Sequence, residues 1–107
     1  ILQAGRGRIC VATYRWRSGE WRLREGPDLT TWPRLVEETD SPTLFCGEVN
    51  MAGADALATI GNLAVLLPAA ARLRRASFLA EIAWRRLNQG NTDDPAKLAP
   101  IYLQHPV

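Results

Sequence analysis

The chain has 107 residues, of which 47% are hydrophobic and 22% charged, a balance typical of one folded globular domain over residues 1–107 rather than a disordered segment. The net charge of +2 is small, and the longest apolar run, Leu63 to Ala71, contains Pro68 and is far shorter than the about 20 residues that a membrane helix needs. We therefore expect no membrane-spanning segment.

The first predicted element is a β-hairpin between Arg8 and Arg24. Apolar residues alternate along it, and Ser18-Gly19 interrupts the alternation where a two-residue loop would place Trp16 opposite Trp21. In this register one face is predicted to be core and carries Cys10, Ala12, Tyr14, Trp16, Trp21 and Leu23. The opposite face turns polar toward the loop and is predicted to be partly solvent-exposed.

Arginine is concentrated at this end of the chain. Residues 1–24 hold six arginines against one acid, Glu20: Arg6, Arg8, Arg15, Arg17, Arg22 and Arg24. Arginines that alternate along a hairpin usually form its solvated face, and we favour this interpretation. A surface that contacts phosphates is the alternative.

The middle of the chain predicts short elements. Gly26-Pro27 is expected to end the second strand, and Trp32 to Glu38 is expected to form a short helix capped by Thr30 or Thr31. Thr43 to Cys46 then predicts a short buried strand, closed by Gly47.

Two further short elements follow. The small, alanine-rich segment Gly53 to Ile60 suits a helix that ends near Gly61-Asn62. Leu63 to Leu67 is continuous and apolar, which is typical of a strand covered on both faces.

The strongest helical pattern runs from Leu73 to Asn88, with Gly90 placed to end the helix as a C-cap. Arg85 and Arg86 fall in its last turn, where cations stabilise the helix dipole; a binding role is the less favoured alternative. After a turn at Asn91 to Pro95, Pro100 precedes an extended tail. Early strands followed by alternating helices and strands indicate an α/β fold.

The sequence shows no constellation for catalysis. Cys10 and Cys46 match no metal motif and are interpreted as reduced, buried thiols, and His105 has no second histidine to complete a metal site or triad. Gly5-Arg6-Gly7 lacks the rest of a nucleotide-binding loop. We predict no catalytic, metal-binding or cofactor-binding residue, so the chain is not expected to be an enzyme.

Several segments together resemble one family. The opening Leu2 to Arg15, the strand and glycine of Leu44 to Glu48, and the closing helix from Phe78 to Leu87 are similar to the C-terminal half of TsaB (YeaZ) proteins. The acidic turn Asp93-Asp94-Pro95 and the tail Pro100-Ile101-Tyr102-Leu103 follow in the order that the family shows. Gln3 stands where the family usually has Asp, Gly5 replaces an Arg, and Cys10 replaces a Tyr.

The resemblance implies one ribonuclease-H-like lobe of the actin and sugar-kinase architecture, with the N-terminal lobe absent. It implies a mixed sheet with an N-terminal antiparallel hairpin, flanking helices and a long C-terminal helix. It also implies a cytoplasmic, non-catalytic scaffold that supports a TsaD-like transferase, with a TsaE-like ATPase, in threonylcarbamoyladenosine modification of tRNA, which the scaffold itself meets only indirectly.

Three functions stay open at this point. The favoured one is this non-enzymatic interaction lobe. A hydrolase of the glycoprotease type is the second, although it needs a metal or nucleophile that the sequence does not show. A small RNA-binding module that uses the hairpin arginines is the third. An isolated lobe exposes a face that its missing half would cover, so we also expect self-association, for example as a homodimer.

Overall fold

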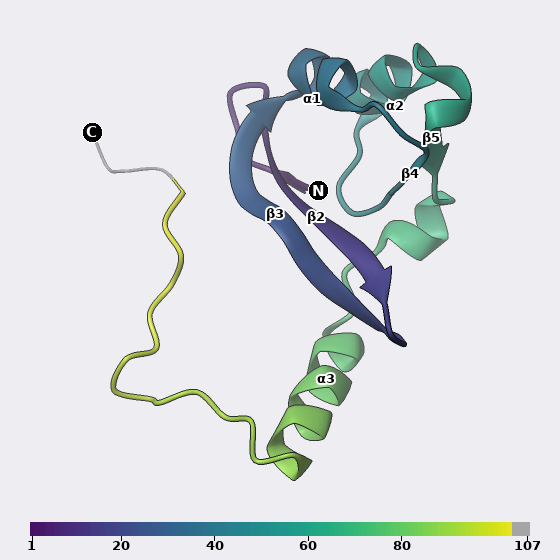
Figure 1. The fold of residues 1–107 in the computed structure, drawn as a ribbon. Helices are drawn as coiled ribbons and strands as arrows, with labels where there is room; N and C mark the ends of the chain where they lie inside the picture. Colours follow the sequence, from purple (N-terminus) through teal and green to yellow (C-terminus); the bar gives the residue numbers. More distant parts are fainter. Residues whose placement is uncertain (104–107) are drawn as a thin grey trace. The chain divides into compact units, whose positions relative to one another are not determined.

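The computed structural model describes residues 1–103, which form a small α/β structure (Figure 1). The chain divides into two compact units, one from Ile1 to Leu73 and one from Arg74 onward, and each is described by itself. The first unit contains an antiparallel sheet of three strands and a parallel pair of strands, together with two α-helices. The second contains one α-helix. The expected α/β fold is confirmed at this level.

The long hairpin is formed by β2 (Arg8–Arg17) and β3 (Glu20–Thr31), which are antiparallel. Trp16 lies opposite Trp21, as predicted. Ser18 and Gly19 both have positive φ, 52° and 82°, which is the backbone that a type I′ turn requires. The alternation and the turn residues therefore specify this register correctly.

The prediction that Gly26-Pro27 ends the second strand is wrong, because β3 continues through it to Thr31. The pairing register shifts between Val11 and Thr13, so the strand accommodates the two residues in an irregularity. A Cβ atom on Gly26 would lie 2.5 Å from the Val11 carbonyl oxygen, which only glycine avoids. Because β3 is an edge strand, the missing N–H of Pro27 is also tolerated.

A two-residue strand, β1 (Leu2–Gln3), connects the hairpin to the rest of the first unit. On one side it pairs antiparallel with β2, with Leu2 opposite Cys10. On the other side the Ile1 amino nitrogen donates to the Cys46 carbonyl oxygen at 3.0 Å, and the Glu48 amide donates to the Ile1 carbonyl oxygen at 2.8 Å. In a parallel pair of strands, one residue bonds to the two residues that flank its partner. Ile1 bonds to Cys46 and Glu48, which flank Gly47, so Ile1 and Gly47 are partners in a bridge of this kind.

The strand that precedes Gly47 is β4 (Thr43–Phe45), which pairs parallel with β5 (Ala64–Leu66). Through the bridge at Ile1, the two sheets join in the order β3-β2-β1-β4-β5. The first unit therefore holds one mixed layer of strands. The predicted strands at Thr43 to Cys46 and Leu63 to Leu67 are both present, each shorter than expected.

Two short helices cover one face of this layer. They are α1 (Trp32–Glu38), whose bounds are as predicted, and α2 (Met51–Ala58), which begins two residues earlier than predicted. The Asn50 side chain caps α2 by accepting a hydrogen bond from the Gly53 amide at 2.9 Å. The buried core lies between the helices and the strands and comprises Ile9, Trp32, Phe45 and Leu57.

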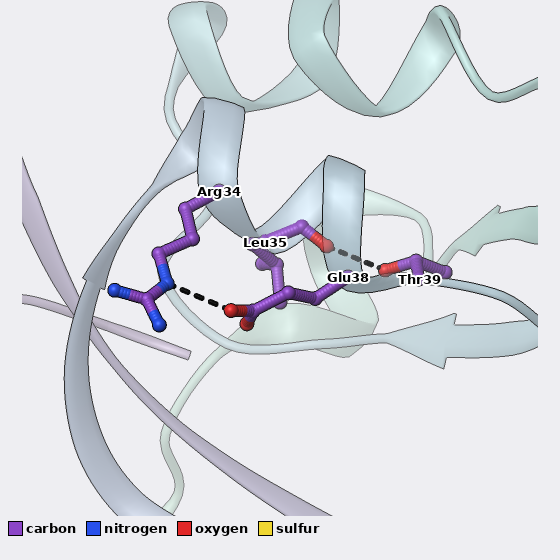
Figure 2. Close-up of polar contacts among 4 residues, drawn as sticks. All are labelled: Arg34, Leu35, Glu38 and Thr39. Atoms are coloured by element: carbon purple, nitrogen blue, oxygen red, sulfur yellow. Dashed lines mark hydrogen bonds and ion pairs between the residues drawn. The ribbon is translucent and has the colours of Figure 1, made fainter.

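At the end of α1 the Thr39 hydroxyl donates to the Leu35 carbonyl oxygen at 2.7 Å, as Figure 2 shows. This bond satisfies one of the carbonyl groups that the end of a helix leaves free. On the exposed side, Arg34 Nε donates to Glu38 Oε1 at 2.7 Å (Figure 2), and this hydrogen bond raises the pKa of Arg34. Thr31 is at the N-cap as predicted, but its side chain makes no capping hydrogen bond.

The second unit begins with α3 (Ala76–Asn88), three residues later than predicted. Gly90 has φ +69° and its amide donates to Leu87, while the Asn91 amide donates to Arg86. These two bonds form a Schellman motif, so the predicted glycine cap is confirmed. No helix of residues 1–103 is long and apolar enough to span a membrane.

The closest packing in the first unit is between Gly53 of α2 and Trp32 of α1. A Cβ atom on Gly53 would overlap the Trp32 indole ring. We predict that Gly53→Ala lowers the free energy of unfolding by about 1–2 kcal/mol, although alanine favours helices by about 1 kcal/mol. Urea denaturation measures the change.

Two controls separate packing from helix propensity. Ala52→Gly, at an exposed position of the same helix, should cost only the about 1 kcal/mol of helix propensity. In a Trp32→Phe background, where the ring is smaller, Gly53→Ala should cost less than in the natural chain. A Gly53→Ala variant more stable than the natural protein would contradict the close contact.

Candidate interaction surface

The side of the hairpin predicted to be core is exposed. Tyr14, Trp16, Trp21 and Leu23 are each 52 to 61% exposed. The prediction is wrong because α1 and α2 cover the opposite side, where Ile9 is fully buried. The alternation of the sequence therefore assigned the residues to the right two faces but the core to the wrong one.

The tip of the hairpin has an ordered aromatic pair. Trp16 and Trp21 are cross-strand partners, and their ring centroids lie 5.3 Å apart with the planes inclined by 68°. This edge-to-face contact contributes about 0.5–1.5 kcal/mol beyond the burial of area. Next to it, Tyr14 lies opposite Leu23. The four side chains form what we call the aromatic face.

The exposed side of the sheet extends from the aromatic face to the parallel strands. Leu44 and Val65 are cross-strand partners that are 50% and 53% exposed, while Phe45, which alternates with Leu44, is in the core. The prediction that Leu63 to Leu67 is covered on both faces is therefore wrong. We call this side the open face, and its exposed large hydrophobic residues are Leu2, Tyr14, Trp16, Trp21, Leu23, Leu44 and Val65.

Four arginines, Arg15, Arg17, Arg22 and Arg24, lie near the same tip, whereas Arg8 lies at the far end of the hairpin. Arg15 pairs with Arg22 across the strands, and Arg17 pairs with Glu20, so these residues occupy the face opposite the aromatic residues. Arg22 forms an ion pair with Glu20 at 2.6 Å, and Arg24 lies 3.6 Å from Glu25. Within residues 1–103, no ion pair involves the side chains of Arg6, Arg8, Arg15 or Arg17.

Arg6 lies in the tight turn between β1 and β2, with φ +53°. In the second unit, Arg85 and Arg86 occupy the last turn of α3, and Arg86 forms an ion pair with Asp93 at 3.2 Å. That ion pair holds the acidic turn next to the end of the helix. The predicted interaction of the two arginines with the helix dipole stays a prediction.

Gln3 and Glu48, two positions singled out by sequence, contact each other. The Gln3 backbone N–H donates to Glu48 Oε2 at 2.7 Å, and the Gln3 side-chain Nε2 donates to the Glu48 carbonyl oxygen at 2.8 Å. These bonds continue the join between β1 and the segment after β4. The role of Gln3 is thus structural, and it depends on an amide donor that an aspartate lacks.

Groups able to do chemistry are dispersed in the described residues. Both thiols are free, as predicted, but the prediction that both are buried is wrong, because Cys46 is exposed and Cys10 is only half-buried. No group of three or more His, Cys, Asp and Glu residues within 1–103 could hold a metal ion. His105 lies outside the described residues.

Comparison of this chain with protein-family models, curated proteins and solved structures gives no match. Its function is therefore argued from its own geometry. That geometry offers a surface for binding: an open apolar face and an arginine-rich tip.

Sequence reasoning missed Leu44 and Val65 as surface residues. A continuous apolar run looks the same whether a strand is covered on one face or on two. The signal that could have found them is the shortage of α-helix: only two α-helices, of 7 and 8 residues, precede Leu73 and must cover the whole sheet. Two such short helices suffice for one face.

The hairpin tip depends on its turn. Gly19 has φ +82°, so we predict that Gly19→Val lowers the hydrogen-exchange protection of the amides near Trp16 and Trp21 at least several-fold, because valine is strained at positive φ. The amides around Ile9 and Leu57 should keep their protection. Ser18→Asn is the matched control, since asparagine accepts positive φ readily. Unchanged protection at the tip of Gly19→Val would contradict the I′ turn.

Proposed function

We propose that this chain is a non-catalytic interaction lobe of the TsaB (YeaZ) type, which supports a TsaD-like transferase in threonylcarbamoyladenosine modification of tRNA. The observation that carries the proposal is the open face. A sheet in a folded domain normally buries an apolar face against a second layer, and within the first unit the open face has none. A partner protein supplies that layer.

The chemistry of the open face suits a protein partner. Leu2, Leu44 and Val65 are aliphatic, and they lie over the three strands that form the middle and one edge of the mixed layer. Exposed apolar clusters of this kind mark protein interaction sites. A second copy of the chain could use the same face, which is the route by which the isolated lobe would self-associate.

The arrangement of the strands also supports the proposal. The resemblance implies a mixed sheet with an N-terminal antiparallel hairpin and flanking helices. The first unit has such a sheet, with α1 and α2 on one face, and α3 provides the long C-terminal helix. We propose that the finer fold is a ribonuclease-H-like lobe. A TsaE-like ATPase follows as a second partner, and the tRNA as an indirect one.

Co-purification with a TsaD-like protein from the same genome tests this function. We predict that this chain, or a longer form that adds a TsaB-like N-terminal half, retains the partner, and that Leu44→Glu or Val65→Glu reduces the retained amount at least tenfold. A charge introduced into an apolar contact is left without water or a counter-ion, which explains the loss.

Leu98→Glu is the matched control, because Leu98 is a strongly exposed leucine of the second unit and its variant should retain the partner. Thermal unfolding of each variant verifies that the fold is intact. Failure of both natural forms to retain the partner would contradict the scaffold function. Full retention by Leu44→Glu and Val65→Glu would exclude the open face as the contact.

A further inference from the structure

We propose that the tip of the β2–β3 hairpin binds single-stranded nucleic acid, with bases stacked on the aromatic face and phosphates contacted by the hairpin arginines. This inference stands on the hairpin alone and does not depend on the TsaB-like function.

The aromatic face presents stacking surfaces to solvent. Trp16 and Trp21 are each more than half exposed, although tryptophan in a folded domain is usually well buried. Because the two ring planes are inclined by 68°, both rings cannot stack on the same base. Each ring therefore accepts a different base. Tyr14, beside them on the same face, offers a third ring. Exposed aromatic rings in a row are the platform on which successive unpaired bases stack.

The positive charge of the chain is concentrated on the same element. The tip, residues 14–25, holds four arginines and two glutamates, a net charge of +2 that equals the net charge of the whole chain. The two glutamates do not neutralise this excess, because each lies beside a single arginine, Arg22 or Arg24. A polyanion such as a nucleic acid is the partner whose charge complements this hairpin.

The pairing of Arg15 with Arg22 is a more specific sign. Like charges directly opposite each other on neighbouring strands destabilise a sheet. An anion held between the two guanidinium groups removes that repulsion, and phosphate accepts paired hydrogen bonds from arginine. In the free protein the ion pair with Glu20 at 2.6 Å already offsets the charge of Arg22, so a phosphate adds the counter-ion that Arg15 lacks among the described residues.

The aromatic and basic residues act together because the tip is narrow. It is a ribbon of two strands, and neighbouring strands are only about 4.8 Å apart. The long side chains of Arg15, Arg17 and Arg22 can therefore reach past the ribbon edge to the backbone of a strand that lies on the aromatic face. Figure 1 shows this end of β2 and β3 extending beyond α1 and α2 of the first unit, and the aromatic side chains there are more than half exposed.

Fluorescence anisotropy with a labelled single-stranded RNA of about 12 nucleotides tests the inference. DNA of the same sequence and the RNA duplex serve as the second and third probes, each at 50 and 200 mM salt. We expect the single-stranded RNA to bind more tightly than the duplex, whether or not the single-stranded DNA also does so. Binding should quench tryptophan fluorescence, and affinity should fall as salt rises.

Two double variants separate stacking from charge. Trp16→Ala/Trp21→Ala should weaken binding by about tenfold or more and abolish the quenching, while the salt dependence stays. Arg15→Gln/Arg22→Gln should weaken binding and reduce the salt slope by about 1 to 2. Trp16→Leu/Trp21→Leu keeps apolar bulk at the tip and should bind as weakly as the alanine variant. It tests stacking even if the alanine variant no longer forms the hairpin.

Two controls complete the design. Arg34→Gln removes an arginine of α1 that is already paired with Glu38, and it should change the affinity less than twofold. Leu44→Glu, which tests the proposed protein contact, should bind the single strand nearly as well as the natural chain, so the two proposals fail independently. Absence of binding at 50 mM salt, equal affinity for the duplex, or natural affinity in the Trp16→Leu/Trp21→Leu variant would overturn the inference.

Discussion

Two hydrogen bonds between Ile1 and the residues on either side of Gly47 hold the first unit together. Without them the unit would consist of a three-stranded antiparallel sheet and a separate parallel pair of three-residue strands. An isolated two-stranded sheet is marginal in water, and parallel strands are normally buried within larger sheets. The Gln3–Glu48 bonds extend the same join. Gly47 is required there, because a side chain at its φ of +96° would overlap the Ile1 carbonyl.

Once the strands form one layer, the helices decide which of its faces is core. Trp32 packs directly on the backbone of α2 at Gly53, so both helices are fixed on the same side as Ile9 and Phe45. Within the first unit no α-helix covers the other side, and its apolar residues are exposed. The functional proposals follow from this asymmetry, with the aliphatic part of the open face assigned to a protein partner and the hairpin tip assigned to unpaired bases.

Local signals predicted local structure well. Ser18-Gly19 specified the hairpin register, and Gly90 specified the end of α3. The bounds of α1 were also predicted, with Thr31 at the N-cap position. Long-range facts were not predictable in this way. The two residues of β1 are too few to show a period, and the continuation of β3 past Gly26-Pro27 depends on its position at the sheet edge. Alternation shows that a strand has two faces, but only the placement of the helices shows which is buried.

The arginines show the same difference between what local sequence signals predict and what depends on the whole fold. Their number was evident from the sequence, and the register was predictable, so the place of Arg15, Arg17 and Arg22 on the face opposite Trp16 and Trp21 was expected. What sequence reasoning could not supply was that the aromatic face is exposed, because exposed tryptophan is the less common case. The favoured interpretation of a solvated arginine face treated the other face as core. Because the aromatic face is exposed, it adds a stacking surface next to the arginines of the tip.

Solvent accessibility of the sheet face tests the central claim most directly. In an NMR experiment with a soluble paramagnetic probe, the account predicts strong broadening of the side-chain signals of Trp16, Trp21, Leu44 and Val65. The signals of Ile9 and Leu57 should stay sharp, because both side chains are almost completely buried. If Leu44, Val65 and the two tryptophans were as protected as Ile9 in the monomer, the face would already be covered, and the account of an open interaction surface would be wrong.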